Sequence, residues 1–358
     1  MEINPYKALA QRLDALPNGF PPTDSGLELD LLAKIFSAEE ADLAAQLRLK
    51  KETAKQIASR LGAETSEISR HLKAMARRGV ITAGRVEGGL GFGLMPFVVG
   101  IYEMQVDSLD KELAALFEEY YQRAFGQLLA IEPQVHRVIP VGESIGVGIE
   151  IQPYESATEI VEQAQDWGVL ECICRKQKML LGDPCQHPID VCMAISQAPD
   201  VFGSGGYVRK VSKSEALATL RRASEAGLVH SVSNNQQGLA YICNCCTCSC
   251  AILRGIAELG IANAVARSNF VNQVEESLCV ACGDCLDFCQ FDALTMDEVC
   301  HVNEVKCVGC GVCVPTCPED ALGLVRRPIE ETQPIPRTMT DWMAIRARER
   351  RLDLSEIL

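Results

Sequence analysis

The most constraining feature of this 358-residue chain is a cysteine pattern that occurs twice near its C-terminal end. Both runs have the spacing C-x2-C-x2-C-x3-C, and the second is followed directly by Pro318. The eight cysteines are Cys279, Cys282, Cys285 and Cys289 in the first run, and Cys307, Cys310, Cys313 and Cys317 in the second. Two residues between thiols let a tight loop present three of them to one centre, and the fourth is better placed to join another. The pattern predicts two metal centres, and the C-x2-C spacing by itself also occurs in zinc sites of four thiolates.

This spacing resembles that of the two-cluster bacterial ferredoxins, in which the fourth cysteine of each run binds the other cluster. The resemblance implies a ferredoxin-like fold with a helix-turn and a small hairpin over residues 291–303. It also implies two [4Fe–4S] clusters, one held by Cys279, Cys282, Cys285 and Cys317, the other by Cys289, Cys307, Cys310 and Cys313. One residue departs from the family pattern, because Gln290 stands where the family usually has proline.

The chain has 18 cysteines, which excludes an ordinary cytosolic composition and requires an explanation. The N-terminal residues contain no apolar segment typical of a secretory signal, and no run approaches the ~20 apolar residues that span a bilayer. We therefore expect a cytoplasmic protein without a membrane span, in which thiols stay reduced. In that setting cysteines serve as metal ligands more often than as disulfides.

Nine further cysteines lie upstream in two groups, four within residues 171–192 and five in the sequence CNCCTCSC. They are Cys172, Cys174, Cys185, Cys192, Cys243, Cys245, Cys246, Cys248 and Cys250. Two groups of closely spaced thiols suggest a site assembled from two segments, holding one or two additional Fe–S clusters; structural zinc and a reactive thiol site are the alternatives. Cys300 has no partner spacing and is expected to be a small buried side chain.

Three neighbouring features bear on this central site. Arg175 is a candidate hydrogen-bond donor to cluster sulfides or a partner for an acid, and His187 is a candidate ligand. A helix beginning near Thr247 or Ser249 would direct its N-terminus toward an anionic cluster.

The N-terminal part has a different pattern, with three short helices and a hairpin predicted over residues 27–93. Ser37 and Glu40 form a predicted capping box, and Thr65 or Ser66 is expected to cap the third helix. The stretch 53–79 resembles a winged helix-turn-helix domain. Residues 46–85 hold ten Lys and Arg against three Glu, and on the third helix Ser66, Ser69, Arg70 and Lys73 are expected to face outward. The resemblance implies either DNA binding or a protein-docking module.

Together these patterns predict a multi-domain α+β protein. An N-terminal extension (1–26) precedes the winged-helix-like domain (27–100) and a helical connecting region (101–170). A cysteine-rich α+β domain, expected to hold Fe–S (171–268), then leads to the two-cluster ferredoxin-like domain (269–325). The C-terminal tail (326–358) contains a short arginine-rich helix, expected to be solvated or to contact a partner.

The function expected from these features is Fe–S electron transfer, as a ferredoxin-like carrier or as a subunit of a larger oxidoreductase of anaerobic metabolism. The net charge is −14, and residues 1–100 hold 13 basic against 12 acidic residues, so the acidity lies in the remainder. An acidic body suits docking on basic protein surfaces, so we expect a redox protein partner and keep nucleic acid as the alternative. Two other functions stay open: a redox-sensing DNA-binding regulator, and an Fe–S enzyme with a substrate site at the central cysteines. No P-loop or dinucleotide-binding fingerprint supports an enzyme.

Overall fold

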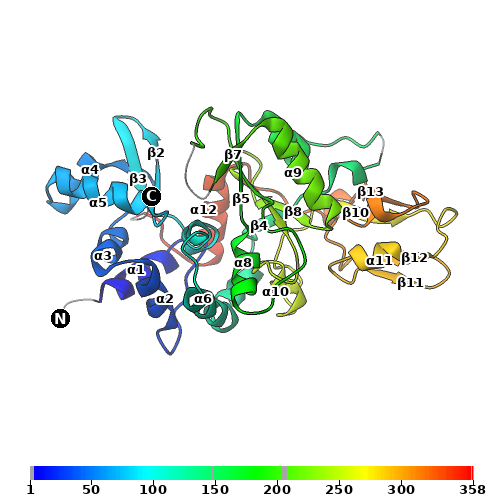
Figure 1. The fold of residues 1–358 in the computed structure, drawn as a ribbon, viewed down its shortest axis with the longest axis horizontal. Coiled ribbons are helices and arrows are strands. Elements are labelled where there is room, and N and C mark those ends of the chain that lie inside the picture. Colours follow the sequence, from blue (N-terminus) through cyan, green and yellow to red (C-terminus); the bar gives the residue numbers. More distant parts are fainter. Residues whose placement is uncertain (1–3, 147, 204–207, 356, 358) are drawn as a thin grey trace. The chain divides into compact units, whose positions relative to one another are not determined.

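The computed structural model describes residues 4–146, 148–203, 208–355 and 357. The chain forms two compact units. Unit 1 comprises Met1–Leu128, Leu180–Gly182 and Met343–Leu358, and unit 2 comprises Leu129–Met179 and Asp183–Trp342. Figure 1 shows the elements of both units in sequence colours. Helices and strands are mixed throughout, as the predicted α+β class requires.

Unit 1 begins with three helices, α1 (Pro5–Asp14), α2 (Leu27–Ile35) and α3 (Ala38–Ala45). The segment expected as an N-terminal extension is instead part of the core, because α1 packs against α3 and buries Leu9 and Leu13. The extension was predicted from Pro17, Pro21, Pro22 and Gly26, which all follow the end of α1 at Asp14. Pro5 does not oppose the helix, because it stands at the first helical position, where its missing N–H costs nothing. The capping box of Ser37 and Glu40 is confirmed at the start of α3.

The next elements of unit 1 are β1 (Glu52–Thr53), α4 (Ala54–Leu61), α5 (Thr65–Arg77), β2 (Thr82–Val86) and β3 (Gly89–Gly93). The strands form an antiparallel sheet in the order β1-β3-β2. The inner face of α5 is buried at Ile68, Leu72 and Met75. Its N-cap is Glu64, however, so the expected cap at Thr65 or Ser66 is wrong.

Two further helices complete unit 1. The helical connecting region contains α6 (Lys111–Arg123), followed by a 3-10 turn at Phe125–Ala130. The arginine-rich helix α12 (Met339–Glu349) is buried at Arg346 and Ala347, which corrects its expected solvated face. Arg346 donates hydrogen bonds to the carbonyl oxygens of Pro17 and Leu128, at 3.0 and 2.9 Å, so its polar head is satisfied inside the unit.

Unit 2 is built on a six-stranded sheet with the order β4-β8-β9-β6-β5-β7. All neighbouring strands are antiparallel. The strands are β4 (His136–Val138), β5 (Asp166–Leu170), β6 (Cys192–Ser196), β7 (Arg209–Val211), β8 (Val229–Ser233) and β9 (Tyr241–Cys245). Helices α7 (Ala157–Gln163) and α9 (Lys213–Glu225) pack on each other, and α9 also contacts β5 and β8 (Figure 1). Strands β8 and β9 pair as an antiparallel hairpin directly before the cysteine cluster.

The C-terminal cysteine repeat also lies in unit 2, between two paired strands. Strand β10 (Phe270–Val274) pairs with β13 (Leu322–Arg326), and the hairpin of β11 (Leu294–Met296) and β12 (Cys300–Val302) lies between them in sequence. The short helix α11 (Asp284–Phe288) falls within the first run, earlier than the helix-turn implied for residues 291–303.

The remaining elements of the two units are short. They are α8 (Ile173–Leu180), α10 (Arg254–Ala257) and helical turns at Phe97–Ile101, Glu103–Gln105, Gly142–Ser144, Pro153–Glu155, Val314–Thr316 and Ile329–Glu331. Within the described residues, every helix is too short or too polar to traverse a bilayer.

Candidate metal centres

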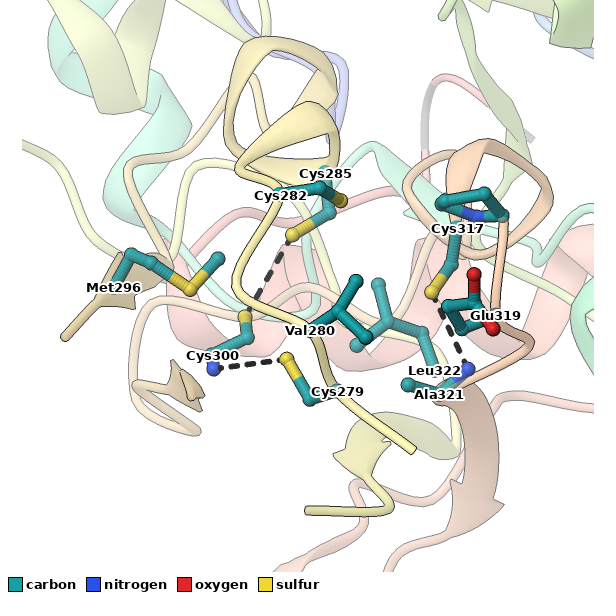
Figure 2. Close-up of a pocket in the computed structure, with 11 residues that line it drawn as sticks. Cys279, Val280, Cys282, Cys285, Met296, Cys300, Cys317, Glu319, Ala321 and Leu322 are labelled. Carbon is teal, nitrogen blue, oxygen red and sulfur yellow. Dashed lines mark hydrogen bonds between the residues drawn. The ribbon is translucent and has the colours of Figure 1, made fainter. Parts of the chain in front are cut away.

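The first thiol group gathers the four cysteines that the resemblance assigned to one cluster. Cys279, Cys282, Cys285 and Cys317 line one cavity, although Cys317 comes from the second run (Figure 2). Val280, Met296 and Leu322 complete its apolar wall. Four converging thiols around an apolar hollow fit a [4Fe–4S] cluster.

Backbone donors already point at the sulfurs of this group. The Cys300 N–H lies 3.4 Å from Cys279 Sγ, and the Ala321 N–H lies 3.2 Å from Cys317 Sγ (Figure 2). Such N–H groups stabilise thiolates and set the reduction potential of a cluster bound to them.

Cys300 is buried in β12, as predicted, but its side chain also lines this cavity. Its Sγ lies 3.7 Å from Cys285 Sγ, and burial raises the pKa of the Cys300 thiol to about 12. Cysteine spacing does not indicate this fifth thiol, because only its place on the three-residue strand β12 brings it to the cavity.

The second thiol group contains Cys289, Cys307, Cys310 and Cys313, the other implied set. Burial, followed by the charges of the other three thiols, raises the pKa of Cys313 well above its ordinary value. Burial likewise raises the pKa of Cys310 to about 12. Thiols this close and this buried ionise together only when a cationic centre offsets their charge, which a metal cluster does.

This second group is packed against other parts of unit 2. Ser144 Oγ donates a 2.6 Å hydrogen bond to the Gly311 carbonyl, and the Val141 N–H donates to the Cys310 carbonyl at 2.9 Å. Gly311 has φ +73°, and a Cβ there would lie 2.6 Å from Ser144 Cβ, so only glycine fits this close approach. Asn272 Nδ2 donates to Cys313 Sγ at 3.3 Å, a contact that sequence reasoning missed.

Six of the nine central cysteines form a third group, in which each thiol interacts with the next around a closed ring. In ring order they are Cys172, Cys174, Cys250, Cys245, Cys243 and Cys192. We call them the six-thiol group. The hydrogen bond with Cys192, then burial, raises the pKa of Cys243 well above its ordinary value, and the hydrogen bond with Cys243, then burial, does the same for Cys245.

The register of three strands explains how these distant cysteines meet. Leu170 at the end of β5 is opposite Cys192 at the start of β6, so Cys172 and Cys192 share one edge of the sheet. Met193 is in turn opposite Ile242, which brings Cys243 to the same edge. Residues two apart on a strand share a face, so Cys243 and Cys245 point to the same side. The remaining three cysteines, Cys185, Cys246 and Cys248, lie elsewhere, close to His187.

Arg175 connects the two cysteine-bearing segments rather than pairing with an acid. It is buried, and its guanidinium donates to the carbonyl oxygens of Pro188 at 3.0 Å and Asn244 at 3.0 and 2.5 Å. The helix expected near Thr247 or Ser249 is not there, because residues 247–253 form turns and α10 begins only at Arg254. No helix N-terminus therefore faces the site from these residues.

Gln290, the departure from the ferredoxin pattern, joins the repeat to the central cysteines. Its Oε1 accepts a 2.8 Å hydrogen bond from the Thr247 N–H, and its Nε2 donates to the Gly227 carbonyl. Proline at this position could make neither contact. The residue next to Cys289 is thus tied to the loop that carries Cys246 and Cys248.

Comparison with known families finds a match to the 4Fe-4S dicluster domain family over residues 278–324. This segment includes all eight cysteines of the repeat. Neither the comparison with curated proteins nor that with solved structures gives a match. The match supports an iron–sulfur protein with a dicluster domain, and the central cysteines lie outside it.

Proposed function

We propose that this protein is an electron carrier, or an electron-transfer subunit of a larger oxidoreductase, with three Fe–S clusters in unit 2. Two are [4Fe–4S] clusters in the C-terminal repeat, with the ligand sets given above, and one is held by the six-thiol group. Bound clusters of this kind exchange single electrons at low potential. The observation that carries the proposal is the gathering of three thiol groups in one compact unit, next to a dicluster match.

The number of central clusters follows from the number of thiols. One [4Fe–4S] cluster needs four cysteines, and two separate clusters need eight. The six-thiol group satisfies one and falls short of two, because the other three central cysteines lie elsewhere. We therefore infer a single central cluster.

The two groups of the repeat differ in exposure, which suggests how electrons enter. In the first group Cys282 is exposed, and the neighbouring Val280 and Leu278 are 62% and 47% exposed. In the second group Cys307, Cys310 and Cys313 are buried, and Cys289 is followed by the Gln290 link. We infer that a redox partner docks on the apolar rim of the first group, and that the second group lies between it and the central one.

Anaerobic analysis of iron and acid-labile sulfide tests this proposal directly. We expect about twelve irons per chain, and dithionite-reduced protein should give an EPR spectrum with the coupling of neighbouring clusters. About eight irons would remove the central cluster from the proposal. A count near zero, with zinc in the repeat, would overturn it altogether.

Binding to nucleic acid is a second candidate, favoured by the exposed outer face of α5. Arg70, Lys73 and Arg77 are exposed there, whereas Arg60 and Arg78 are held in ion pairs with Glu52 and Glu40. A sequence-dependent gel shift at about 150 mM salt would support a regulator. Absence of any shift would leave the N-terminal elements as a protein-docking module.

A further inference from the structure

Four side chains form a compact group apart from the three thiol groups described so far. They are Cys185, His187, Cys246 and Cys248, and their ligand atoms all lie within 4.8 Å of one another. Cys185 Sγ is 3.9 Å from Cys246 Sγ, and Cys248 Sγ is 3.7 Å from His187 Nδ1. Three thiols and one imidazole are thus brought together from two segments about sixty residues apart.

These separations are those of ligands around a single ion. Zinc–sulfur bonds of about 2.3 Å at tetrahedral angles place two sulfurs about 3.8 Å apart, and a zinc–nitrogen bond of about 2.0 Å places N and S about 3.5 Å apart. In a [4Fe–4S] cluster each thiolate extends outward from a different iron, so the four ligand sulfurs lie farther from one another than around one ion. The geometry therefore favours a mononuclear site.

We propose that Cys185, His187, Cys246 and Cys248 bind one zinc ion in a structural Cys₃His site. Four protein ligands complete a tetrahedral shell, which leaves no open position for water or substrate. Zinc has no redox chemistry, so this site takes no part in electron transfer. The proposal is independent of the electron-transfer function, since it concerns cysteines that the three clusters do not use.

The local fold explains why the side chains of Cys245 and Cys246 point in opposite directions. Cys245 ends β9 with its side chain in the six-thiol group, and the next residue of an extended chain points the opposite way. Cys246 is buried on that other side against Val191 and Leu228. Adjacent cysteines therefore serve two different centres, which their sequence alone does not indicate.

Groups around the site also hold its ligands in place. The Thr247 N–H, between two of the ligands, is bound by Gln290 Oε1, and Ser249 Oγ lies 3.8 Å from Cys248 Sγ. Such supporting contacts orient metal ligands and are typical of built sites. Zinc here would join the loop after α8 to the loop after β9, beside the Gln290 link to the repeat.

The test is elemental analysis of the full chain, reconstituted anaerobically with iron, sulfide and equimolar zinc. The wild-type chain should hold about one zinc, with a zinc X-ray absorption spectrum of three sulfurs and one nitrogen. His187→Ala and Cys248→Ala should each lose the zinc and keep the iron content of the wild type. Cys248→His should keep the zinc with two nitrogen ligands. His301→Ala, which removes an exposed imidazole outside the site, should change the content of neither metal.

Two results would overturn the proposal. One is a wild-type chain without zinc. The other is a Cys248→Ala or His187→Ala chain that loses about four irons, because these residues would then hold a cluster. Circular dichroism identifies a variant that fails to fold, and the metal content of such a variant is then not used. In that case the zinc X-ray absorption spectrum of the wild-type chain alone tests the proposed ligand set. A low iron count with zinc intact would instead contradict the electron-transfer proposal and leave the zinc site standing.

Discussion

The C-terminal repeat and the central cysteine region both gather thiols in unit 2, but they do so by different routes. In the repeat, the ligands lie in two short runs, and tight loops bring each run together. In the central region, the thiols come from residues 172–192 and 243–250, and the register of β5, β6 and β9 brings them to one sheet edge. The ligand sets of the repeat can therefore be predicted from the spacing of cysteines in the sequence. The central thiols come together only when the sheet has formed.

Because the two regions gather their thiols differently, the integrity of each should depend on different residues. Loops in the repeat are shaped by cysteine spacing and by positive-φ glycines such as Gly309 and Gly311. The six-thiol group depends on strand pairing and on the buried Arg175 that joins its two segments. The repeat should thus tolerate damage to the central site, and three sets of variants test how far the two regions are separate.

The largest effect should come from removing a single ligand in each region. Cys307→Ala should lose about four irons and the EPR signal of one [4Fe–4S] cluster, because three thiolates hold a cube poorly. Cys192→Ala should lose the central cluster and leave the eight irons and the coupled spectrum of the repeat. Iron counts and EPR of both variants, purified side by side, make the comparison.

Loss of all iron signals in Cys192→Ala would contradict the separation of the two regions, provided that circular dichroism shows a folded chain. Cys300→Ala is the matched control, since it removes a buried thiol of the repeat that belongs to neither implied ligand set.

The second largest effect should come from removing Arg175, whose hydrogen bonds join the two segments of the central region. Arg175→Ala leaves the carbonyl oxygens of Pro188 and Asn244 without their charged donor, which should cost about 3 kcal/mol locally. Amides of residues 172–192 and 243–250 should then exchange hydrogen about 100-fold faster, and amides of the repeat should be unchanged. Arg175→Lys keeps the charge but loses the planar fork, so its effect should be intermediate. Equal acceleration in both regions would show that they open as one unit.

The comparison also explains what could be predicted from the sequence. Cysteine spacing and the ferredoxin resemblance imply two ligand sets, and the structure gathers the members of the first set in one cavity, with Cys317 beside the first run. The central nine could not be divided, because Cys245 and Cys246 are adjacent in sequence and point to different centres. His187 was only a candidate, and nothing in the sequence indicated its distance from Cys248.

Helix predictions failed where tertiary packing decides. Residues 1–26 are expected as an extension because of their prolines, yet α1 buries Leu9 and Leu13. The arginines of α12 are expected to be solvated or to contact a partner, yet Arg346 donates to backbone carbonyls inside unit 1. A buried arginine with such partners has the same sequence signature as an exposed one.

The smallest effect concerns the link between the two regions. Gln290→Ala removes the acceptor for the Thr247 N–H and the donor for the Gly227 carbonyl, and each such hydrogen bond contributes about 1 kcal/mol. We expect the Thr247 amide to exchange hydrogen about tenfold faster, with the iron content unchanged, because no ligand is removed. Gln290→Pro, which restores the usual ferredoxin residue, should behave like Gln290→Ala, since proline offers neither group. The matched control is Gln273→Ala, an exposed glutamine of β10 in the same part of the chain. If exchange at Thr247 were unchanged in both Gln290 variants, the repeat and the central cysteines would be joined by other contacts, and the departure from the family pattern would have no structural role here.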